Sequence, residues 1–556
     1  MSEIVIGIDL GTTNSCAAYV RDGKVVMVPG RNGEAIVPSM LSLDDKGNAA
    51  IGQQAKRRFV TNPRNTIYGA KRLMGRKFGS AEMQDIQKSF FYDIQPDENG
   101  EAQIVVDGQK LSITDFSSQI LEELREQAQE HLEQKVSKAV VSVPAYFDNL
   151  QREAVRAAGA KAGLEVLRVI NEPTAAALSY GFGKRANQKI LVFDLGGGTF
   201  DVTVLQLYDE VYEVIATGGD SFLGGIDFDN IVCGYLLENF KKETGIDLAS
   251  DRVAMQRVRD AAEKVKIDLS ATEKTQVSLP FITVQDGKPV TLQQDIDRST
   301  YVKLVEHLVK QTLRITEKVL LEAKVEKTGI DDIILVGGMT RMPLVQEYVA
   351  RYFGKKPRRD VHPDEVVAQG AAILAHSLSS GSGSGVVLKD VLPVSIGLGI
   401  GQEFRKLINK NTTLPAKLVR SFKTGKDNQE NVVLVLYQGE SRDVSKNNYL
   451  GQVVIDGLTR APKGQVEVLV AFLVDEQGIL SIKAKEKNTD RTITAHFETQ
   501  TVVQRESYRA DVVVGAEGQT AAAPTSEEAT AATPAASNPE NKGGGFLGWL
   551  KRLFGK

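Results

Sequence analysis

Residues 191–205, LVFDLGGGTFDVTVL, consist of two runs of β-branched and aromatic residues around three glycines. This pattern predicts two strands joined by a turn that only glycine can make. Adjacent glycines let backbone N–H groups approach an anion closely. The carboxylates of Asp194 and Asp201 can hold a cation, and the hydroxyl of Thr199 can bond a phosphate oxygen. The stretch therefore predicts a site for a Mg²⁺-bound polyphosphate.

The same pattern occurs near the start of the chain, where residues 4–20 are IVIGIDLGTTNSCAAYV. Asp9 corresponds to Asp194, and Thr12 and Thr13 supply hydroxyls. An ordinary hairpin with a tight glycine turn explains either stretch alone about equally well. Two matching copies in one chain instead indicate two similar lobes, each of which offers a hairpin to one shared cleft.

The composition limits what kind of protein this is. A chain of 556 residues with 42% hydrophobic residues is long enough for several cores, and its net charge of −3 gives no electrostatic case for binding nucleic acid. The two cysteines, Cys16 and Cys233, exclude a disulfide framework and are expected to be buried. No export leader, membrane-length apolar run or zinc spacing of histidines occurs. A cytoplasmic protein is expected.

Other stretches lie between the two hairpins. Lys71 belongs to YGAKRLMGRKFG, which on its own indicates a solvated basic loop. Residues 115–135 predict a helix, and Asp148 or Asn149 could cap the helix that follows the strand VVSV. The strand VLRVI places Glu172 at a strand-to-helix junction, where a carboxylate can line a cleft.

Six motifs follow one another in order over roughly the first 500 residues: GIDLGTTNS, VPAYF, INEPTAAAL, DLGGGTFD, LVGGMTRMP and the KNTT stretch near Asn411. Together they resemble the seventy-kilodalton heat-shock chaperones, the DnaK family. The resemblance implies an α/β actin-like ATPase domain, a duplicated ribonuclease-H-type fold, followed by a β-sandwich peptide-binding domain. It also implies ATP or ADP, Mg²⁺ and K⁺ as cofactors. The implied partners are unfolded or hydrophobic peptide clients, a J-domain co-chaperone and a nucleotide-exchange factor.

The resemblance also assigns roles within the cleft. Lys71 would hold the γ-phosphate and the attacking water, and Glu172 would orient the water and the metal shell, with Thr199 and Asp194 completing the catalytic group. Phosphoryl transfer needs positioning and charge neutralisation more than covalent help, which suits these residue types. The implied cation ligands are Asp9, Asp194 and Asp201. The implied nucleotide contacts are Gly11, Thr12, Thr13, Asn14, Gly196, Gly197, Gly198, Thr199, Glu263, Lys266, Ser270, Gly337, Gly338, Arg341 and Asp364.

Several of these residues have a plainer interpretation when the family is set aside. Glu263, Lys266 and Ser270 share one helix face, which alone indicates a solvated surface. Asp364 could equally cap the next helix. One position departs from the family pattern, because Ile226 in LGGIDFD stands where an acidic residue is usual, although Asp227 is present. Nucleotide contacts are expected to be preserved there, and contacts with an exchange factor or between the lobes are expected to differ.

The family couples its nucleotide and substrate domains through a short apolar linker. Residues 377–385, SLSSGSGSG, form a flexible spacer by composition. The stretch VVLKDVLP that follows resembles that linker, with Asp390 kept and Lys389 interrupting the apolar run. A lysine can bury its stem and keep its charge in water. The implied signalling positions are Pro144, Arg152, Arg168 and Asp390, and Arg168, Asn171 and Thr174 match part of the J-domain contact surface.

The chain from Pro393 to about residue 500 alternates apolar and polar residues between turns, which predicts strands. By the resemblance, Gly425 would stand at the arch of a peptide pocket. The residues implied to line it are Leu398, Ile400, Phe422, Val432 and Leu434. Most apolar residues of a β-sandwich are ordinary core, which is the alternative for each of them.

The resemblance ends near Gln500, where the family continues with a helical lid that is expected to be absent here. The low-complexity stretch that follows cannot bury enough apolar surface to order itself. A peptide bound without a lid is expected to leave quickly in both nucleotide states. The expected divisions are an ATPase domain at 1–380, a linker at 381–392, a β-sandwich at 393–505, a disordered stretch at 506–545 and an amphipathic segment at 546–556.

These features favour a lidless ATP-dependent chaperone that binds exposed hydrophobic segments. A sugar-kinase or actin-like ATPase is an alternative that leaves the β-rich module after Pro393 unexplained. A membrane-tethered scaffold with a regulatory ATPase is a second alternative, which differs in whether peptide binding matters.

Residues 546–556, FLGWLKRLFGK, place apolar residues at helical spacing among three cations. Eleven residues cannot span a bilayer, so we expect weak, salt-sensitive docking to an anionic membrane surface. Trp549 is the only tryptophan, so its fluorescence should shift to the blue when anionic vesicles are added at low salt. An unchanged spectrum would contradict membrane docking. A blue shift before vesicles are added would instead favour packing on the chain's own β-sandwich or in a partner's groove.

Overall fold

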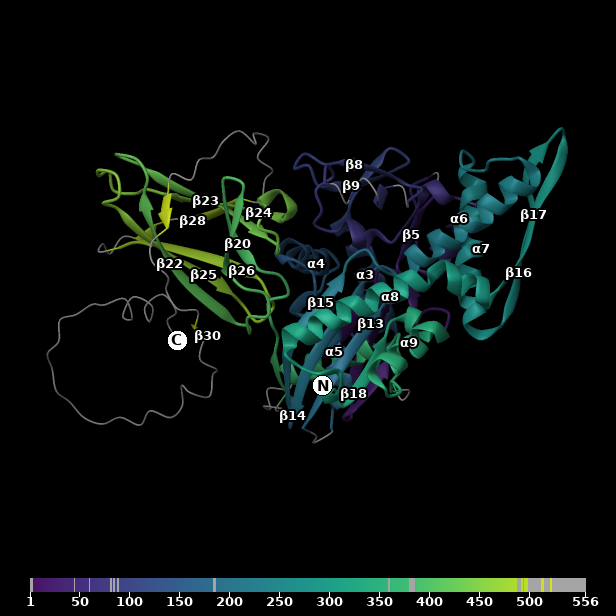
Figure 1. Ribbon diagram of the computed structural model, residues 1–556, viewed down its shortest axis with the longest axis horizontal. Coiled ribbons are helices and arrows are strands. Elements are labelled where there is room, and N and C mark those ends of the chain that lie inside the picture. The colour runs from purple at the N-terminus through teal and green to yellow at the C-terminus, as the bar shows by residue number, and fades with distance from the viewer. Residues whose placement is uncertain are drawn as a thin grey trace. The chain divides into compact units, whose positions relative to one another are not determined.

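The structure is a computed structural model of the whole chain (Figure 1). It describes residues 4–44, 46–59, 61–80, 83, 86–87, 90–183, 187–358, 361–379, 386–487, 492–493, 495–498, 512–514 and 521–522. The predictions for residues 546–556, and for most of residues 506–545, lie outside the described residues. Within the described ranges, none of the helices combines the length and the apolar character that crossing a membrane requires.

The first glycine-rich hairpin forms the centre of one sheet. β1 pairs antiparallel with β2 on one side and parallel with β11 on the other. The strands in hydrogen-bonding order are β12 (Glu165–Asn171), β11 (Lys138–Val143), β1 (Ile6–Asp9), β2 (Asn14–Arg21) and β3 (Lys24–Met27), with β4 (Val37–Pro38) also on β2.

The second hairpin has the same surroundings in a second sheet. β13 pairs antiparallel with β14 and parallel with β18, so Asp194 lies directly opposite Asp201. The order is β18 (Asp332–Val336), β13 (Gln188–Leu195), β14 (Phe200–Tyr208), β15 (Val211–Asp220) and β19 (Val387–Lys389). The predicted internal repeat is therefore present as two sheets built in the same way.

Helices α5 (Glu172–Gly181) and α10 (Val366–Ser379) share one apolar core with residues of both sheets. Their backbones come very close together, because a Cβ added at Gly370 would lie 1.8 Å from the carbonyl oxygen of Ala175. α10 also packs on β1, where a Cβ at Gly7 would lie 2.0 Å from the amide nitrogen of Ala372. Small residues at these contacts join the two sheets closely.

Two predicted helices are confirmed with small changes at their ends. The helix expected at 115–135 is α3 (Ile113–Leu132), which Ser112 and Asp115 begin with a reciprocal capping box. Asp148 caps α4 (Asn149–Lys161), so of the two predicted caps the aspartate is the one used.

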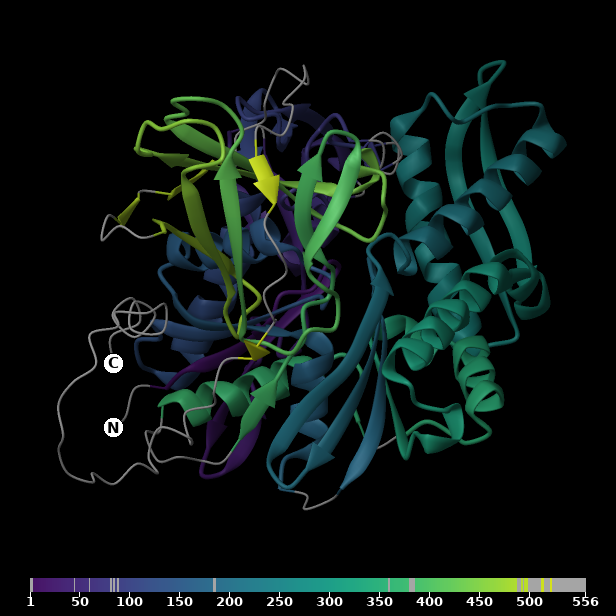
Figure 2. The same cartoon turned by 60° about the vertical axis from the view of Figure 1, so that its left-hand side comes forward.

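The remaining elements of this half of the chain surround the two sheets (Figures 1 and 2). The other helices are α1 (Gln53–Phe59), α6 (Gly225–Thr244), α7 (Arg252–Ala271), α8 (Arg298–Ala323) and α9 (Pro343–Phe353). Short 3₁₀ turns are η1 (Pro63–Asn65), η2 (Ala70–Leu73), η3 (Lys327–Gly329) and η4 (Gly338–Arg341). The smaller sheets contain β10 (Gln109–Ser112), β9 (Ala102–Val106) and β8 (Asp93–Pro96); β6 (Ala49–Ile51), β5 (Met40–Leu43) and β7 (Thr66–Tyr68); and β16 (Lys274–Gln285) with β17 (Lys288–Asp297).

The part after Pro393 is built of strands, as predicted. One sheet contains β21 (Glu403–Ile408), β20 (Ile396–Ile400), β23 (Asn431–Gln438), β24 (Asn448–Asp456) and β28 (Ala495–Glu498). The other contains β27 (Thr492–Ile493), β26 (Leu480–Glu486), β25 (Glu467–Val474), β22 (Ala416–Thr424) and β29 (Val512–Val514). Side chains from both sheets form one apolar core, with the turn η5 (Val444–Lys446) between β23 and β24. A last strand, β30, covers Ala521–Ala522.

The pairing of β29 differs from the prediction of a disordered stretch from residue 506 onward. Val512, Val513 and Val514 pair antiparallel with the end of β22. Three consecutive β-branched residues favour an extended backbone, and the edge of β22 offers backbone groups to pair with. Composition averaged over the long Ala- and Thr-rich stretch hides this short local exception.

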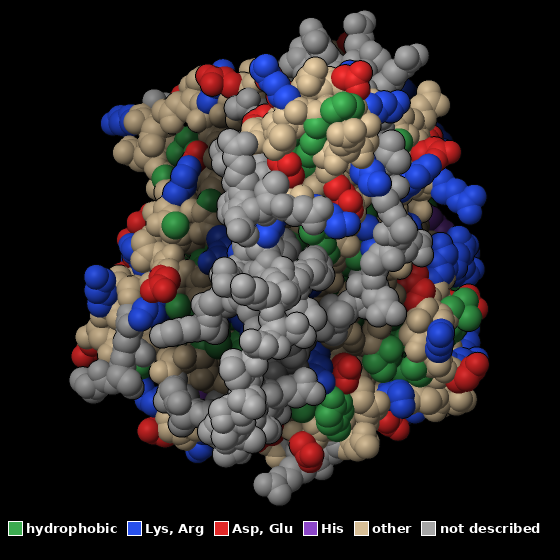
Figure 3. Space-filling view, turned by 90° about the vertical axis from the view of Figure 1, so that its left-hand side faces the viewer, with side chains coloured by type: hydrophobic (Ala, Val, Ile, Leu, Met, Phe, Trp, Pro, Cys, Tyr) green, Lys and Arg blue, Asp and Glu red, His purple; other side chains and the backbone are tan. Residues whose placement is uncertain are grey.

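On the face shown in Figure 3, the Lys and Arg side chains of the described residues are interspersed with Asp and Glu side chains. This agrees with the near-neutral net charge of the chain. Both cysteines, Cys16 and Cys233, are buried and unpaired, as expected.

Candidate functional site

The turns of the two glycine-rich hairpins meet face to face. A Cβ added at Gly197 would lie 1.8 Å from the hydroxyl oxygen of Thr13, and one at Gly198 would lie 2.5 Å from Cγ2 of Thr12. No side chain fits at either position, so the glycines are required by the approach of the other hairpin. The amide of Gly196 donates to the carbonyl of Thr199 at 3.1 Å, which closes the second turn. In the first turn a Cβ at Gly11 would lie 2.0 Å from the carbonyl oxygen of Asn14.

Three carboxylates lie beside these turns: Asp194 and Asp201 are buried, and Asp9 is half-buried. Burial, together with the charge of Glu172, raises the pKa of Asp9 to about 7 and that of Asp201 to about 8. Burial and the same neighbouring charge hold the pKa of Asp194 well above its ordinary value. The hydroxyl of Ser142 donates to Oδ1 of Asp9 at 2.8 Å, a bond that favours the charged form. The cluster therefore holds more negative charge than its surroundings neutralise.

Two buried oxygens at the same place lack a hydrogen-bond partner: Oδ1 of Asp201 and the hydroxyl of Thr13. A buried polar atom without a partner is costly, and a bound cation or its water would satisfy it. Within the described residues, no group of three or more His, Cys, Asp or Glu side chains converges closely enough to enclose a metal. Mg²⁺ keeps several waters and shares its ligands with phosphate, so it is held by fewer protein ligands than an enclosed metal.

Lys71 and Glu172 form a buried ion pair next to the carboxylates. Nζ of Lys71 lies 2.8 Å from Oε1 of Glu172 and also donates to the carbonyl of Leu10. Only 5% of the lysine side chain is exposed, so the solvated basic loop suggested by its neighbours is wrong. The turn η2 directs this lysine into the protein, while Glu172 begins α5 at the predicted strand-to-helix junction.

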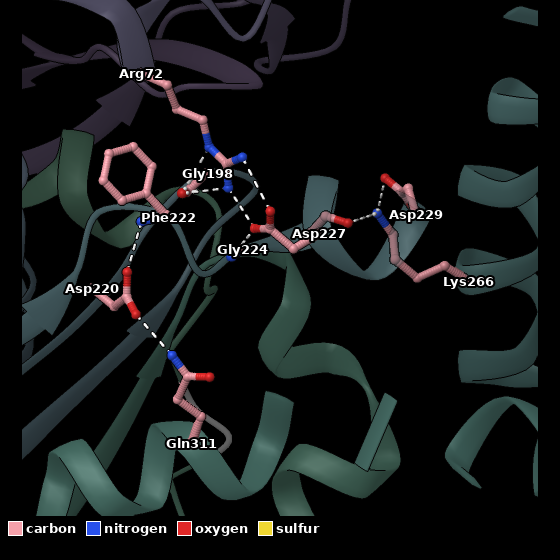
Figure 4. A network of polar contacts seen from close by, with 10 residues as sticks. Arg72, Gly198, Asp220, Phe222, Gly224, Asp227, Asp229, Lys266 and Gln311 are labelled. Carbon is pink, nitrogen blue, oxygen red and sulfur yellow. Dashed lines mark hydrogen bonds and ion pairs between the residues drawn. The ribbon is translucent and has the colours of Figure 1, made fainter. Parts of the chain in front are cut away.

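Arg72 adds a second buried cation that sequence reasoning did not single out. Its guanidinium donates to the carbonyl of Gly198 at 2.7 Å and to Oδ2 of Asp227 at 2.6 Å, as Figure 4 shows. Asp227 also accepts from the amide of Gly224 at 2.8 Å. Arg72 therefore connects the first half of the domain to the second hairpin turn. The only sequence signal was its position directly after Lys71.

Lys71 and Arg72 open onto one small cavity. Its walls carry cations and hydroxyls together, the donors that bind a phosphate oxygen. The lining residues are Thr12, Lys71, Arg72, Arg76, Phe147, Gln151, Thr199 and Ser221. Thr199 thus lines the same cavity as Lys71.

The residues predicted to contact the adenosine lie on α7, on η4 and before α10. Nζ of Lys266 contacts Oδ2 of Asp229 at 2.8 Å (Figure 4). Ser270 donates to the carbonyl of Lys266 at 2.9 Å, and Glu263 pairs with Lys56 at 3.5 Å. The three predicted α7 residues are therefore half-buried and partnered, which disfavours the interpretation of a simple solvated face.

The glycines of LVGGMTRMP allow another close approach. Gly337 has φ +83, and a Cβ there would lie 2.4 Å from the carbonyl oxygen of Leu195. A Cβ at Gly338 would lie 3.3 Å from Oδ1 of Asp364. Nη2 of Arg341 binds Oδ2 of Asp364 at 2.6 Å. The Asp364 carboxylate thus orients an arginine at the same end of the cleft.

Ile226, the departure from the family pattern, faces the other half of the domain. A Cβ added at Gly69 would lie 3.3 Å from Cδ1 of Ile226 and 3.0 Å from the ring of Phe90. An apolar contact therefore occupies a position where the family usually has a carboxylate. Its neighbour Asp227 keeps its polar role with Arg72.

The predicted signalling residues lie near one another. Arg152 is buried and donates to Oδ1 of Asn171 at 2.7 Å and to the carbonyl of Gln477 in the β-sandwich at 3.2 Å. Oδ1 of Asp390 accepts from the hydroxyl of Thr174 at 2.9 Å. Arg168 pairs with Glu476 at 3.0 Å. Pro144 follows β11 and is also buried.

The linker-like run continues a sheet. β19 pairs parallel with β15, which places Lys389 opposite Glu213. Nζ of Lys389 lies 3.4 Å from the hydroxyl of Tyr208 and its side chain is half-buried. The lysine is thus accommodated with its stem packed and its charged end on a polar partner.

The residues predicted for the peptide pocket lie in the apolar core of the β-sandwich or at its margin. Leu398, Phe422, Val432 and Leu434 are buried core residues, and Ile400 packs against that core. The amide of Gly425 donates to Oε1 of Gln429 in the next turn at 2.7 Å. The alternative of ordinary core thus describes four of these side chains in this conformation.

Two comparisons relate this chain to known proteins. A family model described as Hsp70 protein matches residues 5–538. The chaperone protein DnaK of Buchnera aphidicola subsp. Schizaphis graminum (strain Sg) is 45% identical over 493 residues. That alignment covers 88% of this chain and 77% of the Buchnera protein.

The buried carboxylates make a prediction about the protein without metal or nucleotide. Because the pKa of Asp201 is raised to about 8, the folded state keeps a proton that an unfolded aspartate releases near pH 4. The stability that the protonated Asp201 carboxyl gives to the folded state is therefore lost as the pH rises from about 4 to about 8. We expect Asp201→Asn to raise the unfolding free energy at pH 7.5 by on the order of a few kcal/mol, with little gain at pH 5.

Thermal and urea unfolding in the presence of a chelator measures this effect. Asp209→Asn, at an exposed turn, is the matched control and should leave stability nearly unchanged. An Asp201→Asn variant that is no more stable than the parent at pH 7.5 would show that other groups already neutralise this carboxylate.

Proposed function

This chain belongs to the Hsp70 family, and we propose which of its residues perform each part of the family's activity. It is an ATP-dependent chaperone that binds unfolded peptides, and its ATPase domain and β-sandwich are those that the family implies. The comparisons give no support to a sugar kinase or to a scaffold. Proteins of this family use ATP and ADP with Mg²⁺.

The cation would be held by Asp9, Asp194 and Asp201. The unpartnered oxygen of Asp201 and the raised pKa of the cluster support this assignment, because an added positive charge relieves both. Bound there, Mg²⁺ would neutralise phosphate charge during transfer. We propose K⁺ as an accompanying ion on the same acidic cluster.

The phosphates would lie against the two facing turns. Thr12, Thr13 and Thr199 offer hydroxyls, and the glycines leave backbone amides accessible to an anion. The remaining phosphate contacts would come from Gly11, Asn14, Gly196, Gly197 and Gly198. Arg72 positions the second turn through its bond to the carbonyl of Gly198 and is a positioning residue.

The observation that carries the catalytic assignment is the buried pair of Lys71 and Glu172, in which Lys71 lines the small cavity. The lysine supplies a fixed charge where negative charge develops on the transferred phosphoryl group. The glutamate holds the lysine in place and offers an oxygen to orient a water. The adenosine end would be held by Glu263, Lys266, Ser270, Gly337, Gly338, Arg341 and Asp364.

We expect Lys71→Ala to lower the single-turnover rate of ATP hydrolysis about a hundredfold or more, because the lost charge acts mainly in the transition state. Nucleotide binding should survive. Lys77→Ala removes a neighbouring, more exposed lysine paired with Glu101 and is the control, expected to hydrolyse ATP at the parental rate. Hydrolysis by Lys71→Ala at the parental rate would remove Lys71 from the catalytic group.

Coupling between hydrolysis and peptide binding would pass through Asp390. Burial raises the pKa of this carboxyl, while the bond from Thr174 and the charge of Arg152 favour its ionised form. Arg152 also bonds to Gln477, and the amide of Leu480 donates to Oδ1 of Asn149 at 2.8 Å. We propose that the docking of this linker is the two-state element that nucleotide and peptide both bias. Pro144 would transmit the state of the cleft to Arg152, and Arg168 would act in the J-domain contact.

We predict that Asp390→Ala abolishes the acceleration of ATP hydrolysis by a hydrophobic peptide while basal hydrolysis stays within about twofold of the parent. Glu210→Ala, at an exposed turn beside the same β15–β19 pair, should retain the full acceleration. Steady-state ATPase assays with and without peptide make the comparison. A normal response of Asp390→Ala would assign coupling to another residue.

Further assignments remain proposals. We propose the domain limits given by the sequence, except that residues 512–514 pair with the β-sandwich. We also propose a J-domain co-chaperone and an exchange factor as partners, and a cytoplasmic location. Peptide contact by Leu398, Ile400, Phe422, Gly425, Val432 and Leu434 would require the β-sandwich to open beside β22. The missing lid and membrane docking by residues 546–556 also stay predictions, because they concern residues outside those described.

A further inference from the structure

Strand β22 pairs with β25 of the β-sandwich and with two short strands from the chain after it, β29 and β30. On one side it pairs with β25 along its length, from Ala416 opposite Val474 to Lys423 opposite Glu467. On the other side its last three residues pair with β29, which belongs to the segment after the β-sandwich (Figure 2). We propose that β29 is an intramolecular ligand that occupies the edge of β22 and competes there with client peptides. This inference rests on the proposed peptide-binding function of the β-sandwich.

The backbone geometry identifies which residue of β22 faces the edge. The amide of Thr424 donates to the carbonyl of Val466 at 3.1 Å, and its carbonyl accepts from Gly464 at 2.9 Å. Both backbone groups of Thr424 are therefore used on the β25 side. Neighbouring residues of a strand direct these groups to opposite sides. Lys423 thus presents its N–H and C=O to the outer edge, opposite Val513.

An unpaired edge of this kind is a template for an added strand of any origin. Main-chain hydrogen bonds supply affinity without demanding a particular sequence, which suits a protein that binds many unfolded chains. The edge lies between Phe422, in the apolar core, and Gly425, the predicted arch of the peptide pocket. A client strand and β29 cannot pair with Lys423 at the same time.

The segment is well suited to compete. Val512, Val513 and Val514 are β-branched residues, which favour an extended backbone. Residues 499–511 are the whole connection from β28 to β29, so the pairing is intramolecular, with an effective concentration on the order of millimolar. A weak pair of three residues can therefore remain formed, and a client must displace it.

Hydrogen–deuterium exchange and peptide binding on the full-length chain test the proposal. The probe is a fluorescent synthetic peptide with the sequence of residues 508–518, YRADVVVGAEG. Val513→Pro removes the N–H that would donate to Lys423 and breaks strand pairing. Val503→Pro places the same change in the connection, outside residues 512–514, and is the matched control.

We expect Val513→Pro to bind the probe about threefold to tenfold more tightly than the parent. In the parent, β29 occupies the edge of β22 in most molecules, so the apparent affinity for the probe falls in proportion to the fraction of molecules whose edge is free. Amides around Lys423 should exchange faster in this variant. Val503→Pro should match the parent in both measurements. Equal probe affinity and equal exchange in all three proteins would overturn the proposal.

Two further outcomes are decisive. Protection of Lys423 that falls on dilution would show that the strand comes from a second copy, which overturns the intramolecular ligand. The chaperone assignment can fail separately, namely if no hydrophobic client peptide binds or accelerates ATP hydrolysis. Exchange protection that is lost in Val513→Pro but kept in Val503→Pro would still support the pairing of β29 in that case.

Discussion

The central constraint in this protein is the burial of negative charge. Asp194 and Asp201 are buried beside Glu172, and Asp9 is half-buried next to them. Lys71 is a buried cation in direct contact with that glutamate. An isolated charge is expensive in such a place, and the raised pKa values of the aspartates express that cost. The folded chain holds together a site whose own charges favour an additional cation. These buried charges therefore lower the stability of the folded chain and favour the binding of a cation.

The way the two hairpins approach each other explains why this site can exist. Gly197 and Gly198 bring one turn against Thr13 and Thr12 of the other. α5 and α10 then join the two sheets behind the turns through contacts that also require small residues, such as that between Gly370 and Ala175. Any movement that separates the lobes must separate these turns. The nucleotide site is consequently sensitive to the positions of both halves.

The linker and the tail use the same physical device, a strand added to the edge of a sheet. β19 extends the second sheet beside β15, and β29 extends the β-sandwich beside β22. Each pairing depends on main-chain hydrogen bonds of a short segment, so each can form and separate at modest cost. A buried polar contact adds selectivity to the pairing of β19, because Asp390 accepts a hydrogen bond from Thr174 beside it. Edge pairing is thus where this fold can respond to a ligand without unfolding a core.

The sequence by itself determined the duplicated hairpins, the strand-rich second module and the acidic residues of the cleft, because glycine turns and alternating hydrophobicity are local properties of the chain. It also offered Asp148 or Asn149 as a helix cap and, by resemblance to a family, a linker that contains Asp390. Only the tertiary structure decided that Lys71 is buried on Glu172, that Arg72 bonds to Gly198, and that Val512–Val514 pair with β22. These contacts join residues far apart in the chain, and their energies depend on burial and on distance in space. A basic loop and a low-complexity tail carry no local signal of the partners that folding brings to them.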